Sequence, residues 1–218
     1  MKEGILMSNK LKSKTSTKKM IVFTLFAALI VVMAFTVGYI PLGFMNATII
    51  HIPVIIGAII LGPARGGALG FVFGLTSLIN NTIKPNITSF VFTPFYSLDP
   101  RFNGSFKSIL ICFVPRILIG VISGYLYKAL SKTRLNKAVV LAVTGFVGSM
   151  VNTVFVMGGI YFLYGENYAA AKGMGIEALM GVIMGIVGMN GVPEAIVAAI
   201  LTSAVVIPLG KYLKKNPL

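Results

Sequence analysis

The residues best suited to chemistry in this chain are a few polar side chains set in long apolar runs. Arg116 follows Pro115 at the head of a run that stays apolar as far as Leu126. A guanidinium keeps its charge in a protein, and placing it at the centre of a bilayer costs about 2.5–3.5 kcal/mol on insertion scales. Such a residue persists where it meets water, an acidic partner or an anionic ligand. Arg116 therefore either extends to the outer headgroups or binds a solute, and both interpretations stay open at this point.

Three more polar residues stand within or beside apolar runs, namely Asn152, Asn190 and Glu194. Carboxamides and a carboxylate together supply hydrogen-bond donors and acceptors for a polar ligand. Two structural alternatives remain open. Asn152 can instead join two helices by side-chain hydrogen bonds, and Glu194 can serve only as the ion-pair partner of Arg116.

Two prolines suggest how these residues are positioned. Pro115 precedes Arg116, and Pro193 precedes Glu194. Proline is common in the first turn of a helix, so the pattern predicts two helices that begin near the same outer face. Their N-terminal dipoles would then point into whatever lies between them.

Composition places these residues in a membrane protein. Of 218 residues, 56% are hydrophobic and 11% charged, and the mean hydropathy is +0.92. A soluble domain would need far more charge on its surface. The single cysteine, Cys112, and the single histidine, His51, exclude a disulfide framework and a histidine or cysteine metal cluster. We find no phosphate-binding loop, zinc-protease motif or serine or cysteine nucleophile motif. The chain is therefore predicted to be neither an enzyme nor a cofactor-binding protein.

Six apolar runs predict an all-α, polytopic membrane protein with six transmembrane helices. The runs are Met20–Gly38, Ile49–Leu61, Gly66–Ile79, Lys107–Tyr127, Ala138–Tyr164 and Val192–Leu209. The second run is short for a bilayer, so it must be shielded by its neighbours or begin near Asn46. The third is rich in glycine, which permits close contact between helices.

The distribution of positive charge predicts the orientation. With six crossings and the N-terminus inside, fourteen of the nineteen lysines and arginines fall on the cytoplasmic side, as the positive-inside rule requires. Both termini are then cytoplasmic. The predicted organisation is a basic N-terminal segment (1–19), a single membrane domain (20–213) and a short tail (214–218), with Met1 or Met7 as the start. Because topology explains the net charge of +14, no nucleic-acid partner is needed.

Two segments between the predicted crossings remain. Met174–Met189 is apolar and glycine-rich, but a seventh crossing would carry the C-terminal lysines outside. We therefore interpret it as a re-entrant or interfacial helix on the outer side. Residues 80–106 form the longest polar stretch after the N-terminus, and a loop of this length is usually functional. It could cover a binding pocket.

Several short motifs resemble one family of transport proteins. They are Pro41–Pro53, Gly57–Pro63, Gly70–Ser77, Val114–Gly120, Val151–Val154 and Pro193–Ile196. In these motifs the chain resembles the substrate-binding S component of energy-coupling factor (ECF) vitamin transporters, most closely the pantothenate-type branch. The resemblance extends over nearly the whole chain, from Met20 to Leu213.

The resemblance implies a subunit of the cell membrane that binds a vitamin at its outer side. It implies partners as well, namely a membrane coupling protein with two cytoplasmic ATP-binding subunits, on which the S component topples to release the vitamin inside. Members of the family often dock through Ala-x-x-x-Ala in the first span. Here the nearest pattern is Thr24-Leu-Phe-Ala-Ala28, which departs from it.

By analogy with the family, the pocket residues are Arg116, Asn152, Glu194, Asn190 and Asn80. The carboxylate of pantothenate suits Arg116, because charge-assisted hydrogen bonds are the strong ones. Another small vitamin of the hydroxymethylpyrimidine or pyridoxine type is the near alternative. An autonomous secondary carrier is the far one, although such carriers typically contain an internal repeat and none is evident.

Overall fold

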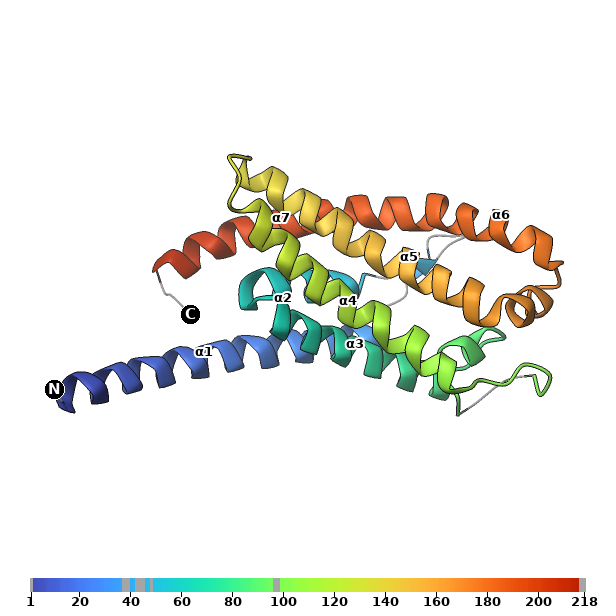
Figure 1. Ribbon diagram of the computed structural model, residues 1–218, viewed down its shortest axis with the longest axis horizontal. Helices are drawn as coiled ribbons and strands as arrows, with labels where there is room; N and C mark the ends of the chain where they lie inside the picture. The colour runs from blue at the N-terminus through green and yellow to red at the C-terminus, as the bar shows by residue number, and fades with distance from the viewer. Residues whose placement is uncertain (1, 37–39, 42–45, 48, 96–98, 216–218) are drawn as a thin grey trace.

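A computed structural model describes residues 2–36, 40–41, 46–47, 49–95 and 99–215. The chain forms an elongated bundle of helices (Figure 1). The helices are α1 (Lys2–Phe35), α2 (His51–Leu61), α3 (Pro63–Ile83), α4 (Phe106–Leu130), α5 (Lys137–Ala171), α6 (Ile176–Ile186) and α7 (Val192–Lys215), with a 3-10 turn η1 (Ser89–Val91) and a π turn η2 (Val187–Gly191). Strands β1 (Ile40–Pro41) and β2 (Asn46–Ala47) form one short antiparallel pair. Most of the predicted loop Pro41–Thr48 and of the predicted tail 214–218 lies outside the described residues.

Four of the helices are long and apolar enough to cross a membrane, which confirms a multi-pass membrane protein. They are Thr17–Phe35, Phe106–Leu130, Lys137–Ala171 and Ile176–Tyr212. At 11 residues, α2 is about 16 Å long, or about half the thickness of the hydrocarbon core. Every residue of α2 except Ile60 is buried. The expectation that this short segment needs shielding by its neighbours is therefore confirmed.

The prediction of a separate re-entrant or interfacial helix near 174–189 is wrong. α6 passes through η2 directly into α7, so that Ile176–Tyr212 is one helical run of 37 residues. Figure 1 shows this run lying along one side of the bundle without turning back. A re-entrant segment must reverse its direction, whereas here the π turn Val187–Gly191 continues the chain from α6 into α7.

The prediction that Pro115 lies in the first turn of its helix is also wrong. α4 begins earlier, at a capping box in which Ser105 and Ser108 each bind the backbone N–H of the other, an arrangement that satisfies two otherwise unpaired donors. Pro115 therefore lies well inside α4. Pro193 is the second residue of α7, but because η2 continues into α7 there is no free helix N-terminus at this point.

The two ends of the bundle differ. The N-terminus of α1, the C-terminal part of α7 and the turn between α4 and α5 lie at one end, on the left in Figure 1. The opposite end carries the turn between α5 and α6 and the segment between α3 and α4. We call the described part of that segment, residues 84–95 and 99–105, the cap.

The apolar core is divided into two clusters. The first gathers side chains of α1 to α5 and α7, around Ile30, Ile55 and Leu141. The second gathers the cap with parts of α4, α5 and α6, around Phe90, Ile160 and Leu179. This division leaves room for polar side chains at the level where the clusters meet.

Candidate substrate-binding site

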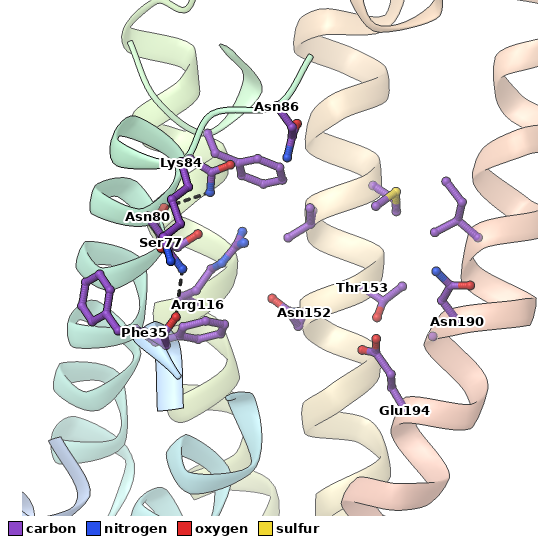
Figure 2. Close-up of a pocket in the computed structure, with 18 of the residues that line it drawn as sticks. Phe35, Ser77, Asn80, Lys84, Asn86, Arg116, Asn152, Thr153, Asn190 and Glu194 are labelled. Carbon is purple, nitrogen blue, oxygen red and sulfur yellow. Dashed lines mark hydrogen bonds between the residues drawn. The ribbon is translucent and has the colours of Figure 1, made fainter. Parts of the chain in front are cut away.

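A cavity of about 440 Å³ lies between the two apolar clusters. Its walls come from the C-terminal end of α1, the second half of α3, the cap, α4, α5 and the run of η2 and α7. All the residues that the sequence suggested for a pocket line this cavity: Asn80, Arg116, Asn152, Asn190 and Glu194. Figure 2 shows them on helices that surround a common space.

Arg116 is buried in the wall of the cavity, with 7% of its surface exposed. Its Nη1 donates a hydrogen bond of 2.9 Å to the carbonyl oxygen of Ile111. Its Cζ lies 5.5 Å from the ring centre of Phe73 on α3 and 5.2 Å from that of Phe92 in the cap. Both distances are within the range of cation–π attraction. The guanidinium therefore has a defined place at the junction of three elements.

Close packing of α3 against α4 brings Arg116 to this place. A Cβ atom on Gly70 would overlap the carbonyl oxygen of Arg116, and one on Gly120 would overlap the backbone of Gly66. Only glycine allows backbones to approach so closely. The expectation that the glycine-rich third run permits close helix contact is confirmed, and α3 can thus supply Phe73 on one side of the guanidinium.

Asn152 and Thr153 are two of the α5 residues that line the cavity. In Figure 2 Asn152 points into the space between α4 and α5, and Thr153 lies on the side of α5 that faces Asn190. The Oδ1 atom of Asn152 is buried and has no hydrogen-bond partner among the described residues. An acceptor of this kind is costly to leave unpaired, so Asn152 is well placed to receive a ligand hydroxyl or amide.

Asn190 and Glu194 enter the cavity from the run of η2 and α7. Asn190 belongs to the π turn, and Glu194 lies in the first turn of α7. Gly191 packs tightly on α5, since a Cβ there would lie 2.7 Å from Cγ2 of Thr153. Single π turns within α-helices are frequent at functional sites. Here the turn brings the polar residues of this run against α5.

Asn80 has a structural role that the sequence did not suggest. Its Nδ2 donates a hydrogen bond of 2.9 Å to the carbonyl oxygen of Ala34. This bond fixes the C-terminal end of α1 to α3 at the margin of the cavity. Asn80 therefore helps to build the wall in addition to lining it.

Residues 18–206 match the family described as "ECF transporter, substrate-specific component". The chain belongs to this family. It is 37% identical, over 77% of its length and 79% of the relative, to the pantothenic acid transporter PanT of Lactococcus lactis subsp. cremoris (strain MG1363). It is 32% identical, over 88% of its length and 92% of the relative, to the pantothenate transporter PanT of Leuconostoc mesenteroides subsp. mesenteroides. The expected resemblance is thereby confirmed, and the chain is a transport protein of the cell membrane.

The substrate-specific component carries cavity residues that the sequence did not single out. Lys84, Asn86 and Phe92 come from the cap, and Ser77 comes from α3. Polar residues are ordinary in a loop, and a phenylalanine is ordinary in a membrane protein, so none of them stood out. Only the unusual length of the polar stretch 80–106 indicated that this region contributes to a site.

The cap of this substrate-specific component is firmly attached to the helices. The Ser108 hydroxyl donates to the Phe90 carbonyl at 2.7 Å and lies 2.7 Å from the Tyr164 hydroxyl. The Thr93 hydroxyl lies 2.7 Å from that of Thr82, and the Ser89 hydroxyl donates to Oδ1 of Asn81 at 3.0 Å. Phe92 is thus held on a backbone that is anchored to both α3 and α4.

The charges around the cavity favour an anion with further polar groups. Arg116 and Lys84 are basic residues, Glu194 is an acidic residue, and the other polar lining residues of the described chain carry amides or hydroxyls. Its volume falls within the range of small-molecule sites. A small solute that carries one carboxylate together with hydroxyl or amide groups matches this lining best.

Proposed function

We propose that this chain is the pantothenate-binding subunit of an ATP-driven ECF importer. Family membership makes it the component that determines the substrate, and both named relatives are transporters of pantothenate or pantothenic acid. The observation that carries the proposal is that Arg116 shares one cavity with Asn152, Asn190 and Glu194. Pantothenate has the groups that this set can bind, namely one carboxylate, two hydroxyls and one amide.

We assign the carboxylate to Arg116, which can bind it through two parallel hydrogen bonds. Asn152, Asn190 and Glu194 bind the hydroxyls and the amide. Asn80 completes the wall beside α1. The cap covers the cavity and provides Phe92 as an apolar surface for the ligand and for Arg116.

The proposed topology has six crossings, with both termini in the cytoplasm and the cavity toward the outside. Its support is that α1 begins and α7 ends at the same end of the bundle (Figure 1), as an even number of crossings requires. The turn between α4 and α5, at this same end, carries Lys132 and Arg134. The cap and the cavity lie toward the other end. α3 serves as the third crossing, and α2, which is shorter than the hydrocarbon core is thick but is buried by its neighbours, serves as the second.

Transport requires partners in this proposal. The chain contains no phosphate-binding loop, so a coupling protein and two cytoplasmic ATP-binding subunits supply the energy for uptake. The chain alone binds the vitamin but does not accumulate it. Uptake that depends on the ATPase subunits separates this function from that of an autonomous secondary carrier.

Thermal unfolding of the purified protein against a panel of vitamins tests the proposed substrate. Ligands that bind only the folded state raise its stability in proportion to the logarithm of their concentration over Kd. Pantothenate should raise the unfolding temperature, whereas hydroxymethylpyrimidine and pyridoxine should leave it unchanged. Stabilisation by one of these two instead of pantothenate would assign the chain to another vitamin.

A further inference from the structure

Pro115 and Ile111 form an unusual arrangement in the middle of α4. In an α-helix the N–H of each residue binds the carbonyl four residues earlier, so an ordinary residue at position 115 would bind the carbonyl of Ile111. Proline has no N–H, and its ring also presses on that carbonyl. Pro115 therefore deprives the Ile111 oxygen of the partner that a regular helix would provide.

The side chain of the next residue takes that place. Nη1 of Arg116 donates to the Ile111 oxygen at 2.9 Å, and this bond is buried. The contact draws the Arg116 side chain back along α4 toward the cap, where its Cζ meets the ring of Phe92 at 5.2 Å. Neighbouring side chains commonly satisfy the backbone groups that proline frees in membrane helices. Here the residue that does so is also the main cation of the cavity.

We propose that Pro115 is a positioning residue for recognition of the ligand carboxylate. By freeing the Ile111 carbonyl, it provides an acceptor that holds the Arg116 guanidinium in its place before the ligand arrives. A guanidinium held in this way loses less conformational freedom on binding, and the affinity is higher as a result. This inference rests on the proposed function, because it assumes that the carboxylate of pantothenate meets Arg116.

The substitution Pro115→Ala separates a role in positioning Arg116 from a role in folding. If Pro115 were needed for folding, its loss would lower the unfolding temperature, whereas a positioning role predicts weaker ligand binding without a loss of stability. Alanine restores the N–H to the helix, so the ligand-free protein should unfold at the same temperature or a higher one. The Ile111 oxygen now receives a backbone donor and holds Arg116 less firmly. We expect the Kd for pantothenate to rise about tenfold, and the Kd for its uncharged primary amide to change less than about twofold.

The matched control is Pro208→Ala, the same exchange inside α7 and outside the residues that line the cavity. It should leave both Kd values unchanged. Pro115→Ser, which also restores the N–H, provides a second variant should the alanine variant fold poorly. In the Arg116→Ala background, Pro115→Ala should have no further effect on pantothenate binding, because coupled residues are not additive.

Three results would overturn the proposal: equal weakening of acid and amide, unchanged binding of both, or full additivity with Arg116→Ala. Each of these results would mean that Pro115 affects only the geometry of α4 and does not position Arg116 for the ligand. The failure of the proposed function looks different, because the unsubstituted protein would then not bind pantothenate at all. Binding of acid and amide with equal affinity by the unsubstituted protein would remove the carboxylate contact and the role of Pro115 with it.

Discussion

Arg116 belongs to the fold and to the candidate site at the same time. It contacts α3 through Phe73, the cap through Phe92 and its own helix through Ile111. A charge in an apolar run was enough to predict that Arg116 has a special environment. The residues that create this environment could not be predicted in the same way, since Phe73 and Phe92 are ordinary aromatic residues until the fold brings them beside the guanidinium.

Replacing Arg116 tests its direct contact with the ligand. Arg116→Ala should weaken pantothenate binding by more than about 2 kcal/mol, because a buried charged partner is lost. Arg116→Lys should recover only part of this loss, since an ammonium cannot form the bidentate fork. Calorimetric titration with pantothenate and its primary amide provides the measurement. The amide should bind the unsubstituted protein poorly and lose little further affinity in the alanine variant. If the binding energy lost through Arg116→Ala and that lost through amidation of the ligand simply add, Arg116 does not contact the carboxylate.

The contribution of Phe92 to ligand binding can be tested against a control residue from the same cap. Phe92→Leu removes a ring that lies 5.2 Å from Cζ of Arg116 and should weaken pantothenate binding by about 1 kcal/mol. Phe95 is the matched control, because its side chain is 71% exposed and it does not line the cavity. Equilibrium binding should therefore be unchanged in Phe95→Leu. Equal losses in the two variants would argue against a specific contribution of Phe92.

At the scale of elements, apolar length and turn residues predicted most helices well. The predicted fourth and fifth runs agree with α4 and α5, and Tyr164, the predicted end of the fifth, is where the backbone of α5 leaves helical geometry. The errors occur where tertiary packing overrides local signals. The charge distribution favoured a separate helix at Met174–Met189, but Gly191 packs against Thr153 and the π turn continues the helix into α7.

The contact between α3 and α4 gives a prediction about stability. Gly70→Ala should lower the free energy of unfolding by about 1–3 kcal/mol, because the new methyl group meets the backbone of Arg116. Gly158→Ala is the same exchange in α5, where no described atom apart from the adjoining backbone and chain neighbours of its own helix lies within 4 Å of the new methyl group. It should be neutral or stabilise by up to about 1 kcal/mol. Unfolding of both variants in detergent distinguishes these cases, and a neutral Gly70→Ala would contradict the close contact.

At the scale of the whole molecule, the chain has one strongly basic end and one end that carries the polar cap. Composition and charge predicted a membrane protein and an orientation, because both depend on sums over the chain and little on packing. They could not predict the cavity, since its lining residues come from segments between Ala34 and Glu194. That convergence depends on how the helices pack.

Cysteine labelling tests the proposed orientation. The native Cys112 is fully buried, so it should react little with a membrane-impermeant reagent. Cysteines introduced at Lys132 or Lys214 should react only from the cytoplasm, and those at Asn86 or Asn167 only from outside. Labelling of Lys214→Cys from outside would show an odd number of crossings and exclude the six-crossing arrangement.

The exposed face of α1 is the expected docking surface for the coupling protein. Thr24 and Ala28 are exposed on it, whereas Ala27 packs against the first apolar cluster. Ala28→Trp should impair ATP-dependent uptake and leave vitamin affinity nearly intact. Val205→Trp, at an exposed position on α7, is the control that should leave both unchanged. Normal uptake by Ala28→Trp would remove this face from the docking surface.

The π turn at 187–191 has a consequence for how such a protein can change over evolution. A π turn holds one residue more than the α-helical turn that it replaces, so deletion of one residue here restores a regular helix. Every side chain before the deletion then rotates by about 100° relative to those after it. A single codon can therefore exchange the polar groups that α6 and α7 offer to the cavity while both helices are preserved. A deletion of one residue at this position is therefore expected to change which ligand the cavity accepts.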